Sequence, residues 1–425
     1  MNAYVGIDLG STTTKAVVLA QDGSILGKGI TNSRSNYDLA AEVARTEAFV
    51  TARFGLLRRE VEKVAGIALL DRLMRAFRVQ QNLVQMRRLQ ELVDEEVDRG
   101  VVPDLRAPTR AVLDAIFKRV EAEEEAWFAE ENPGTRSDFF RDVIGSAYTR
   151  SAEAIVPDTG LAFDLFLGLW DKCIIRVENE PIGLGFADHI GTAITRLGSP
   201  PSVIEGVERA LAVDLQATST VGTGYGRARL PFPKEQIRSE ILCHGLGAHA
   251  MFPGTRTVLD IGGQDTKAIQ IDAEGIVTSF QMNDRCAAGC GRYLGYIADE
   301  MNIGLHELGP IAMKSTRNVK INSTCTVFAG AELRERLSLG ERREDILAGL
   351  HRAVILRAMS LLARSGGIED EFTFTGGVAN NPAAVSALVQ LVQENYGTKI
   401  LNISPSSIYT GALGAAMFAA QGVSS

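Results

Sequence analysis

The cysteines of this chain are the residues whose type and spacing first suggest chemistry. Cys286 and Cys290 lie among small residues in NDRCAAGCGRY (283–293), and Cys325 follows in INSTCTVFAG (321–330). Such thiols can be packing residues, disulfide partners or metal ligands. The total of five cysteines is odd, and MNAYVGIDLG lacks the basic and apolar segments of a signal peptide. We therefore expect a cytoplasmic, reducing location, which disfavours a disulfide.

The overall composition narrows the class of protein. The chain has 425 residues, of which 45% are hydrophobic and 23% charged, so it can form roughly two to three domains with ordinary cores. A net charge of −8 disfavours a general nucleic-acid binder. No run of 18 uncharged apolar residues occurs, so we expect no membrane span.

An internal repeat indicates how the chain is organised. GIDLGSTTTKAVVLAQDGSIL, from Gly6, aligns without a gap with VLDIGGQDTKAIQIDAEGIV, from Val258. The matched positions are Asp8 with Asp260, Gly10 with Gly262, Lys15 with Lys267, and Asp22-Gly23 with Glu274-Gly275. Each copy is typical of a strand, a Gly-rich turn, a second strand and a hairpin turn. Two copies in register predict a duplicated α/β domain with a cleft between its halves.

The Gly-rich turn of each copy favours phosphate binding. Glycines let backbone N–H groups approach an anion, and a carboxylate at the end of the first strand can hold Mg²⁺ through water. A plain β-hairpin is the alternative for either copy alone. The turns match neither a Walker A loop nor a Rossmann fingerprint, because the pattern G-x-x-x-x-G-K-[ST] is lacking and each turn leads into a strand.

Two further Gly-rich segments lie near the C-terminus. In FTFTGGVANNP (372–382) an apolar strand runs into a turn before a helix, which would let the backbone approach a flat ligand such as adenosine. An ordinary strand-to-helix turn is the alternative. YTGALGAAMFAA, from Tyr409, is equally consistent with tight helix packing and with contact to a nucleotide.

These motifs together resemble the acetate and sugar kinase/Hsp70/actin superfamily. More closely, TGYGR (223–227), SEILCHGLGA (239–248), DIGGQDTK, NDRCAAGCGRY, STCTVFAGAEL (323–333) and GGVANN resemble the ATPases that activate 2-hydroxyacyl-CoA dehydratases and benzoyl-CoA reductases. The resemblance covers residues 1–34 and 200–422. It implies an α/β class and a duplicated, RNase H-like ATPase fold.

The resemblance also implies an ATP and Mg²⁺ site and a shared iron–sulfur cluster. Asp8 and Asp260 would position Mg²⁺, and Gln264 would orient the attacking water. The expected nucleotide-binding residues are Gly10, Ser11, Thr12, Thr13, Thr14 and Lys15, then Gly262, Gly263, Asp265 and Thr266, then Gly376, Gly377 and Asn380. Lys15 and Lys267 are weaker candidates, because each could equally face solvent.

Cys286 and Cys325 correspond to the family's ligands of a [4Fe-4S] cluster that bridges two subunits, each giving two thiolates. Cys290 stands where many activators carry Thr. A buried packing residue is the preferred interpretation and a third ligand the alternative. Cys243 is interpreted as packing near the cleft, His244 as a weak candidate for a hydrogen bond there, and Cys173 as a core residue.

The segment between the two covered regions suggests a subtype. We expect residues 1–34 and 196–255 to form the first ATPase half, 35–195 a helical insertion, and 256–425 the second half. The periodicity of the segment 61–97 predicts a helix, a second helix is expected to stop at Asn132-Pro133-Gly134, and AFDLFLGLWDKCIIRV is either a buried strand or a helix.

This insertion and CAAGCGRY are most similar to the larger ATPase subunit of ATP-dependent benzoyl-CoA reductases. That resemblance implies electron transfer from ferredoxin through the cluster to acyl-CoA-reducing subunits, with ring reduction to a cyclic dienoyl-CoA. A smaller related ATPase subunit would supply the other two cysteines. The alternatives are an activator of a 2-hydroxyacyl-CoA dehydratase, a small-molecule kinase of the same superfamily, and a non-catalytic ATP sensor.

Overall fold

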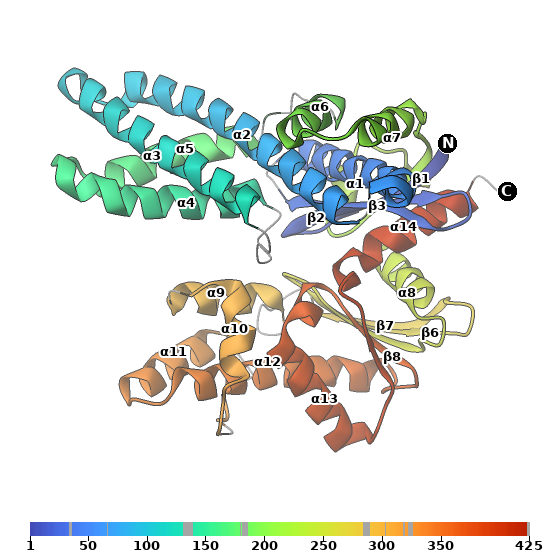
Figure 1. Cartoon of the computed structure of the whole chain (residues 1–425). Coiled ribbons are helices and arrows are strands. Elements are labelled where there is room, and N and C mark those ends of the chain that lie inside the picture. The colour runs from blue at the N-terminus through green and yellow to red at the C-terminus, as the bar shows by residue number, and fades with distance from the viewer. Residues whose placement is uncertain are drawn as a thin grey trace. The chain divides into compact units, whose positions relative to one another are not determined.

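A computed structural model describes residues 1–33, 36–65, 67–130, 139–178, 180, 186–283, 290–301, 303–317, 319–321 and 326–422. The chain divides into two compact units. We call Arg34–Leu215, together with Met1, the helical unit, and Asn2–Ser33 with Gln216–Ser425 the core unit. Figure 1 shows the elements of both, coloured along the chain.

The core unit contains the two copies of the repeat as two sheets of matching topology. The first sheet has the order β3-β2-β1-β4 and the second β7-β6-β5-β8-β9. In each sheet the first strand of the repeat pairs antiparallel with the second strand and parallel with a later one. The strands are β1 (Asn2–Leu9), β2 (Thr13–Ala20), β3 (Ile25–Asn32), β4 (Gln216–Thr223), β5 (Thr257–Ile261), β6 (Thr266–Ile271), β7 (Val277–Asn283), β8 (Phe372–Thr375) and β9 (Leu401–Ile403).

The hairpin turns of the two copies need glycine for the same reason. Gly23 and Gly275 both have φ of +81°, a conformation that side chains with a Cβ rarely adopt. The turns join β2 to β3 and β6 to β7. The predicted strand–turn–strand–hairpin pattern is thus present twice.

Two helices, α8 (Glu240–Met251) and α14 (Thr410–Gln421), join the halves of the core unit. They pack against each other, α14 on β1, β2 and β4, and α8 on β5, β6 and β7 (Figure 1). Their backbones touch, because a Cβ on Gly414 would lie 1.9 Å from the carbonyl oxygen of Cys243 and one on Gly247 2.0 Å from that of Thr410. The YTGALGAAMFAA segment therefore does form a tightly packed helix.

The remaining helices of the core unit follow the second sheet. They are α9 (Gly291–Glu300), α10 (Leu305–Ala312), α11 (Thr326–Ser338), α12 (Arg343–Ser365) and α13 (Pro382–Tyr396). Of the described helices, α12 alone is long and apolar enough to cross a membrane, but 67% of its most apolar window is buried. Its side chains form a core with β5, β8 and α13, which accounts for its apolar composition.

The helical unit consists of α1 (Tyr37–Ala65), α2 (Ile67–Gly100), α3 (Pro103–Ala129), α4 (Phe140–Ile155), α5 (Phe163–Glu178), α6 (Phe186–Leu197) and α7 (Pro201–Ala212). The helix predicted over 61–97 is divided between α1 and α2, and Asn132-Pro133-Gly134 lies outside the described residues. The segment left open between strand and helix is α5. It buries Phe166, Leu169, Trp170, Cys173, Ile174 and Val177, at the spacing of one helix face.

Long α2 takes part in two apolar cores of this unit. One core joins α2 to α3, α4 and α5, and the other joins α2 to α1, α6 and α7. In the second core, Val203 and Val207 of α7 pack with Phe54 of α1. For this reason the observed unit ends at Leu215, whereas the sequence places its end at 195.

Candidate active site

In each copy of the repeat, the aspartate lies opposite the lysine of the same copy on the neighbouring strand. Asp8 lies opposite Lys15 in the register of β1 and β2, and Asp260 lies opposite Lys267 in that of β5 and β6. Lys15 Nζ is 3.7 Å from Asp8 Oδ2, and Lys267 Nζ is 3.5 Å from Asp260 Oδ2. Lys267 is only 2% exposed, so the alternative that this lysine faces solvent is wrong.

Asp260 is the most heavily contacted carboxylate of the site. Its Oδ1 accepts a hydrogen bond of 2.8 Å from the Thr375 hydroxyl and lies 3.2 Å from His244 Nδ1. Burial by itself would raise the pKa of Asp260, but the charges of His244 and Lys267 hold it well below its usual range. Burial likewise opposes protonation of His244, yet the Asp260 carboxylate raises the pKa of this imidazole.

Lys267 joins further carboxylates to this cluster. Its Nζ lies 2.8 Å from Asp265 Oδ1 and 3.6 Å from Glu240 Oε2. Glu240 in turn pairs with Arg227 at 3.1 Å. Burial would lower the pKa of Lys267, but Asp260, Asp265 and Glu240 outweigh burial and raise it. The Lys267 ammonium therefore stays charged, and its ion pair with Asp265 fixes the position of that carboxylate.

The two phosphate-type loops approach each other. Gly262 N–H donates to the Asp265 carbonyl at 3.0 Å, which closes the second loop as a tight turn. A Cβ on Gly263 would lie 2.2 Å from Thr12 Oγ1, so the loops meet where glycine leaves space. Thr12 is exposed, whereas Gln264 is partly exposed. The structure thus brings together the loops that the sequence separates by most of the chain.

Of the hydroxyls in the first loop, Thr14 differs from the others. It is fully buried in β2, and its Oγ1 lies 3.0 Å from Ser33 Oγ. Ser11 and Thr13 are partly exposed beside Gly10. In the second loop Thr266 is buried at the start of β6. The side chains open to a ligand are therefore those nearer the tip of each loop.

The third Gly-rich turn adjoins the second loop. Gly376 has φ of +86°, and a Cβ there would lie 2.3 Å from the carbonyl oxygen of Ile261. Gly377 and Asn380 are exposed within the 3₁₀ turn Gly377–Asn380. Because Thr375 bonds to Asp260 just before this turn, the turn is anchored at the charged cluster.

The segments that carry Cys286, Cys290 and Cys325 lie between the second loop and the third Gly-rich turn in the sequence. Cys286 and Cys325 lie outside the described residues. Cys290 is 1% exposed and directly precedes α9, as the packing interpretation expects. The N–H groups of Gly291 and Arg292 donate to the carbonyls of Gly262 and Gly263, at 2.8 and 2.7 Å. The start of α9 is therefore bonded to the second loop itself.

Asp8 is a buried carboxylate at the end of β1 that pairs with Lys15. Among the described residues no group of three or more His, Cys, Asp or Glu side chains could hold a metal ion. Mg²⁺ in nucleotide sites needs only one or two carboxylates, since phosphates and waters complete its shell. A Cβ on Gly224 would lie 2.4 Å from Asp8 Oδ1, so glycine preserves the space beside this carboxylate.

Several residues of the site were missed in the sequence or weighted low. Glu240 and Arg227 belong to the motifs SEILCHGLGA and TGYGR, and only the burial of Glu240 and its pairing with Arg227 reveal them. His244 lies between the halves, because a Cβ on Gly411 would lie 2.8 Å from its Nε2 and 3.0 Å from Asp8 Oδ2. No local signal distinguishes these side chains from ordinary helix and loop residues.

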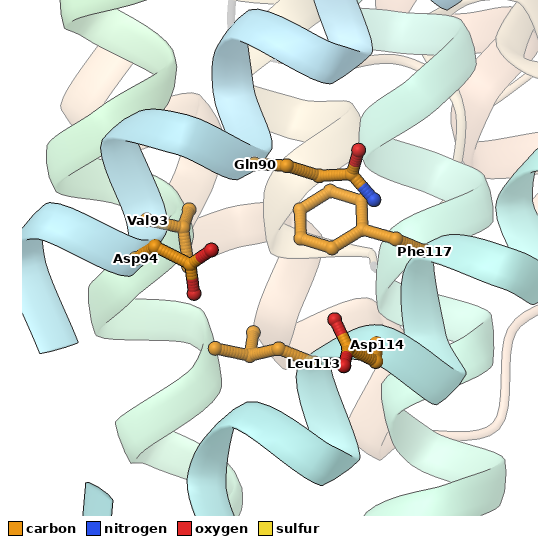
Figure 2. Close-up of a pocket in the computed structure, with 6 residues that line it drawn as sticks. All are labelled: Gln90, Val93, Asp94, Leu113, Asp114 and Phe117. Carbon is orange, nitrogen blue, oxygen red and sulfur yellow. The ribbon is translucent and has the colours of Figure 1, made fainter.

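A separate cavity of about 170 Å³ lies in the helical unit between α2 and α3. Figure 2 shows its lining, with Gln90, Val93 and Asp94 from α2 and Leu113, Asp114 and Phe117 from α3. Two carboxylates in so small a space repel a phosphate. We therefore do not assign the nucleotide to this cavity.

Comparison with known proteins gives a family model and several relatives. The model of the BadF/BadG/BcrA/BcrD ATPase family matches residues 5–419. The (R)-2-hydroxyglutaryl-CoA dehydratase activating ATPase of Acidaminococcus fermentans is 41% identical over 248 residues, 58% of this chain and 92% of that protein. A benzoyl-CoA reductase subunit from Thauera aromatica is 31% identical over 209 residues, 49% of this chain and 73% of that protein.

A solved structure shows the same fold. The activator of the 2-hydroxyisocaproyl-CoA dehydratase from Clostridium difficile, with bound ADPNP, has a TM-score of 0.53 at 24% identity. The similarity covers 99% of this chain and 96% of that one. The predicted duplicated actin/Hsp70/sugar-kinase-type ATPase fold is thereby confirmed.

Proposed function

Because the chain belongs to the BadF/BadG/BcrA/BcrD ATPase family, we propose that it is an ATP-hydrolysing activator that delivers electrons to a 2-hydroxyacyl-CoA dehydratase. The observation that carries this proposal is the meeting of the two Gly-rich loops, with Thr12 against Gly263 and an aspartate behind each loop. This geometry suits a nucleotide whose phosphates lie between the loops. The dehydratase activator of Acidaminococcus fermentans is 41% identical and the benzoyl-CoA reductase protein of Thauera aromatica 31%, which favours the activator role.

The residues of the chain have separate roles in this proposal. Backbone N–H groups at Gly10 and Gly263 bind the phosphates, helped by hydroxyls at the first loop, while the Gly262 N–H keeps the second loop closed through its bond to Asp265. Asp8 and Asp260 position Mg²⁺. Gln264 orients the attacking water. Gly377 and Asn380, the exposed residues of the Gly377–Asn380 turn, contact the adenosine.

The second loop also connects the nucleotide to the cysteine segment. Cys286 and Cys325 hold the cluster together with two thiolates from a partner subunit. A [4Fe-4S] cluster supplies one-electron transfer when it is bound. Since Gly291 and Arg292 bond to Gly262 and Gly263, a nucleotide that moves this loop also moves the start of α9, which follows Cys286 closely in the sequence. We propose that this connection is the route by which ATP binding acts on the segment that would hold the cluster. Ferredoxin would be the source of the electrons.

A second candidate is the larger ATPase subunit of a benzoyl-CoA reductase. This candidate rests on the resemblance of CAAGCGRY and of the insertion to that subunit, and on the length of this chain, since the activating ATPase of Acidaminococcus fermentans is matched over 92% of its length but only 58% of this chain. The helical unit is thus a large addition to the core unit. In this candidate a smaller ATPase subunit supplies the partner thiolates, and the acceptor is a set of acyl-CoA-reducing subunits.

Anaerobic purification followed by iron analysis and electron paramagnetic resonance tests the cluster assignment. We expect Cys286→Ser and Cys325→Ser to lose the cluster signal, while the control Cys173→Ser, in the helical unit, keeps it. If Cys286→Ser and Cys325→Ser both kept a normal cluster, neither cysteine would be a ligand. Cys290→Thr is expected to keep the cluster, and its loss would make Cys290 a ligand.

Activity assays test the nucleotide site and the choice of partner. Asp8→Asn should lower ATPase turnover at least roughly tenfold with the iron content unchanged, and exposed Asp158→Asn should not. Reduced protein is then mixed with ATP and either a 2-hydroxyacyl-CoA dehydratase or benzoyl-CoA-reducing subunits. Activation of the first supports the proposed role, and activation of the second alone supports the other candidate. A colourless protein that phosphorylates a small molecule would be a kinase.

A further inference from the structure

A buried histidine of α12 uses both of its ring nitrogens in hydrogen bonds. His351 is 1% exposed. Its Nδ1 lies 2.7 Å from the carbonyl oxygen of Leu347, and its Nε2 lies 3.0 Å from the side-chain nitrogen of Asn381. His351 and Asn381 are far apart in the sequence, and neither the repeat nor the cysteine motifs predict this contact.

The hydrogen bonds of Asn381 fix the protonation state of His351. Asn381 caps α13, and its Oδ1 accepts from the backbone N–H groups of Ala383 and Ala384, at 3.0 and 3.2 Å. Its Nδ2 must then be the donor to His351 Nε2. His351 Nε2 is therefore the acceptor, and Nδ1–H donates to Leu347. Burial lowers the pKa of His351, in agreement with this neutral tautomer.

Asn381 also ends the turn proposed to contact adenosine. Its backbone N–H donates to the Val378 carbonyl at 3.0 Å, within the Gly377–Asn380 turn. A Cβ on Gly309 of α10 would lie 2.7 Å from Asn381 Oδ1, so α10 closes off one side of this amide. The turn is held at its other end by Gly376, which packs on Ile261. The hydrogen bonds of Asn381 thus help to fix the position of the Gly377–Asn380 turn.

We propose that His351 is a positioning residue for nucleotide binding, which acts through Asn381 to hold the Gly377–Asn380 turn against the adenosine side of the ligand. This inference rests on the proposed function, because it assumes that the turn contacts the nucleotide. His351 itself is buried and touches no ligand. Its effect should fall on nucleotide affinity and not on the hydrolytic step, since the phosphate loops and Asp8 are left intact.

The first test measures ADP affinity and ATPase kinetics of the full chain, purified anaerobically, with MgADP and MgATP as probes. In His351→Leu, Asn381 Nδ2 loses its acceptor, and we expect Kd for ADP and KM for ATP to rise about tenfold with kcat within roughly twofold. His351→Gln supplies an amide oxygen as acceptor and should recover most of the affinity. Exposed His306→Leu, also in the core unit, is the control.

A second variant decides the question if His351→Leu does not fold. Asn381→Asp keeps an oxygen for the two backbone N–H groups but places a second oxygen opposite His351 Nε2, which then needs a proton. We expect ADP binding by this variant to weaken about tenfold at pH 8 and to recover as the pH falls and His351 Nε2 takes up a proton, whereas wild-type binding changes little. A pH profile like that of wild type would overturn the inference.

The outcomes separate this inference from the proposed function. A wild-type protein that binds no ADP contradicts the nucleotide site itself. A wild-type protein that binds ADP, with unchanged affinity in His351→Leu or Asn381→Asp, contradicts only the role of His351. A fall in kcat at unchanged KM would also contradict it, because positioning of the adenosine side should act on binding.

Discussion

Lys267 Nζ lies 3.5 Å from Asp260 Oδ2 in the second half of the core unit, and the first half repeats this pair with Lys15 and Asp8 at 3.7 Å. The strand register places each lysine opposite its aspartate. The two pairs differ in burial, because Lys267 is almost fully enclosed and also contacts Asp265 and Glu240. The duplication has thus produced two largely buried pairs, of which the second is more enclosed and has more carboxylate partners.

Replacing the two lysines should therefore have unequal effects on stability. Lys267→Met removes the buried cation shared by Asp260, Glu240 and the partly exposed Asp265, and we expect a loss of about 3–5 kcal/mol in the free energy of unfolding. Lys15→Met should cost less, because the Lys15 side chain is 12% exposed and contacts one carboxylate where Lys267 contacts three. Urea denaturation at pH 7 measures both. Equal losses would contradict the difference in burial as the cause.

The histidine of α6 should make the helical unit sensitive to acid. His189 packs at 5.4 Å, centroid to centroid, against Phe77, and neither of its ring nitrogens has a hydrogen-bond partner among the described residues. Burial lowers its pKa, although Asp188 and Glu47 oppose the change. The folded state thus keeps His189 neutral while the unfolded chain takes up a proton below about pH 6.5, so stability falls as pH falls below that value.

His189→Leu removes this titration and an unsatisfied buried polar group. We expect the variant to gain about 1–2 kcal/mol at pH 7 and more at pH 5.5. Thermal melting at pH 7.5 and 5.5 provides the comparison, with exposed His306→Leu as the control. His351 and His244 titrate equally in both proteins, so the difference isolates His189. A variant that melts below wild type at pH 5.5 would rule out this account.

The crossing of α8 and α14 should not tolerate a methyl group. Gly414→Ala would place Cβ 1.9 Å from the Cys243 carbonyl oxygen, so the helices must separate, and we expect a cost of about 1–3 kcal/mol. Gly295→Ala, in α9, meets nothing within 4 Å and should be neutral or stabilising by up to about 1 kcal/mol. Chemical denaturation measures the free energy of unfolding of both variants. A neutral Gly414→Ala would mean that the helices are more loosely packed.

The contact between the phosphate-type loops gives a prediction for nucleotide binding. Gly263→Ala directs a methyl group at Thr12, and we expect Kd for ADP to rise about tenfold while the fold is retained. Gly23→Ala has open space but a positive φ, so it should lower stability by about 1 kcal/mol and leave ADP affinity unchanged. Titration calorimetry and thermal melting separate the two effects. Normal ADP affinity in Gly263→Ala would place the phosphates elsewhere.

The sequence was informative wherever the signal is local. The repeated Gly-rich turns and hairpins were predicted because glycine and alternating apolar residues dictate strand–turn–strand structure over short spans. The same applies to helix α5, whose apolar spacing fits one helix face, although apolar content alone did not decide between helix and strand. The end of the helical unit was less predictable, since α7 belongs there only through packing on α1.

By itself, the sequence determined that two copies of one hairpin motif flank a long helical segment, and that glycines and aspartates recur at matched positions. Only the tertiary structure decided which side chains surround Asp260, that Lys267 is buried, and that His351 supports Asn381. These contacts join residues far apart in the chain, and their chemistry depends on burial and on the orientation of individual atoms. Neither property follows from residue type or spacing, because both arise only when the sheets and helices pack.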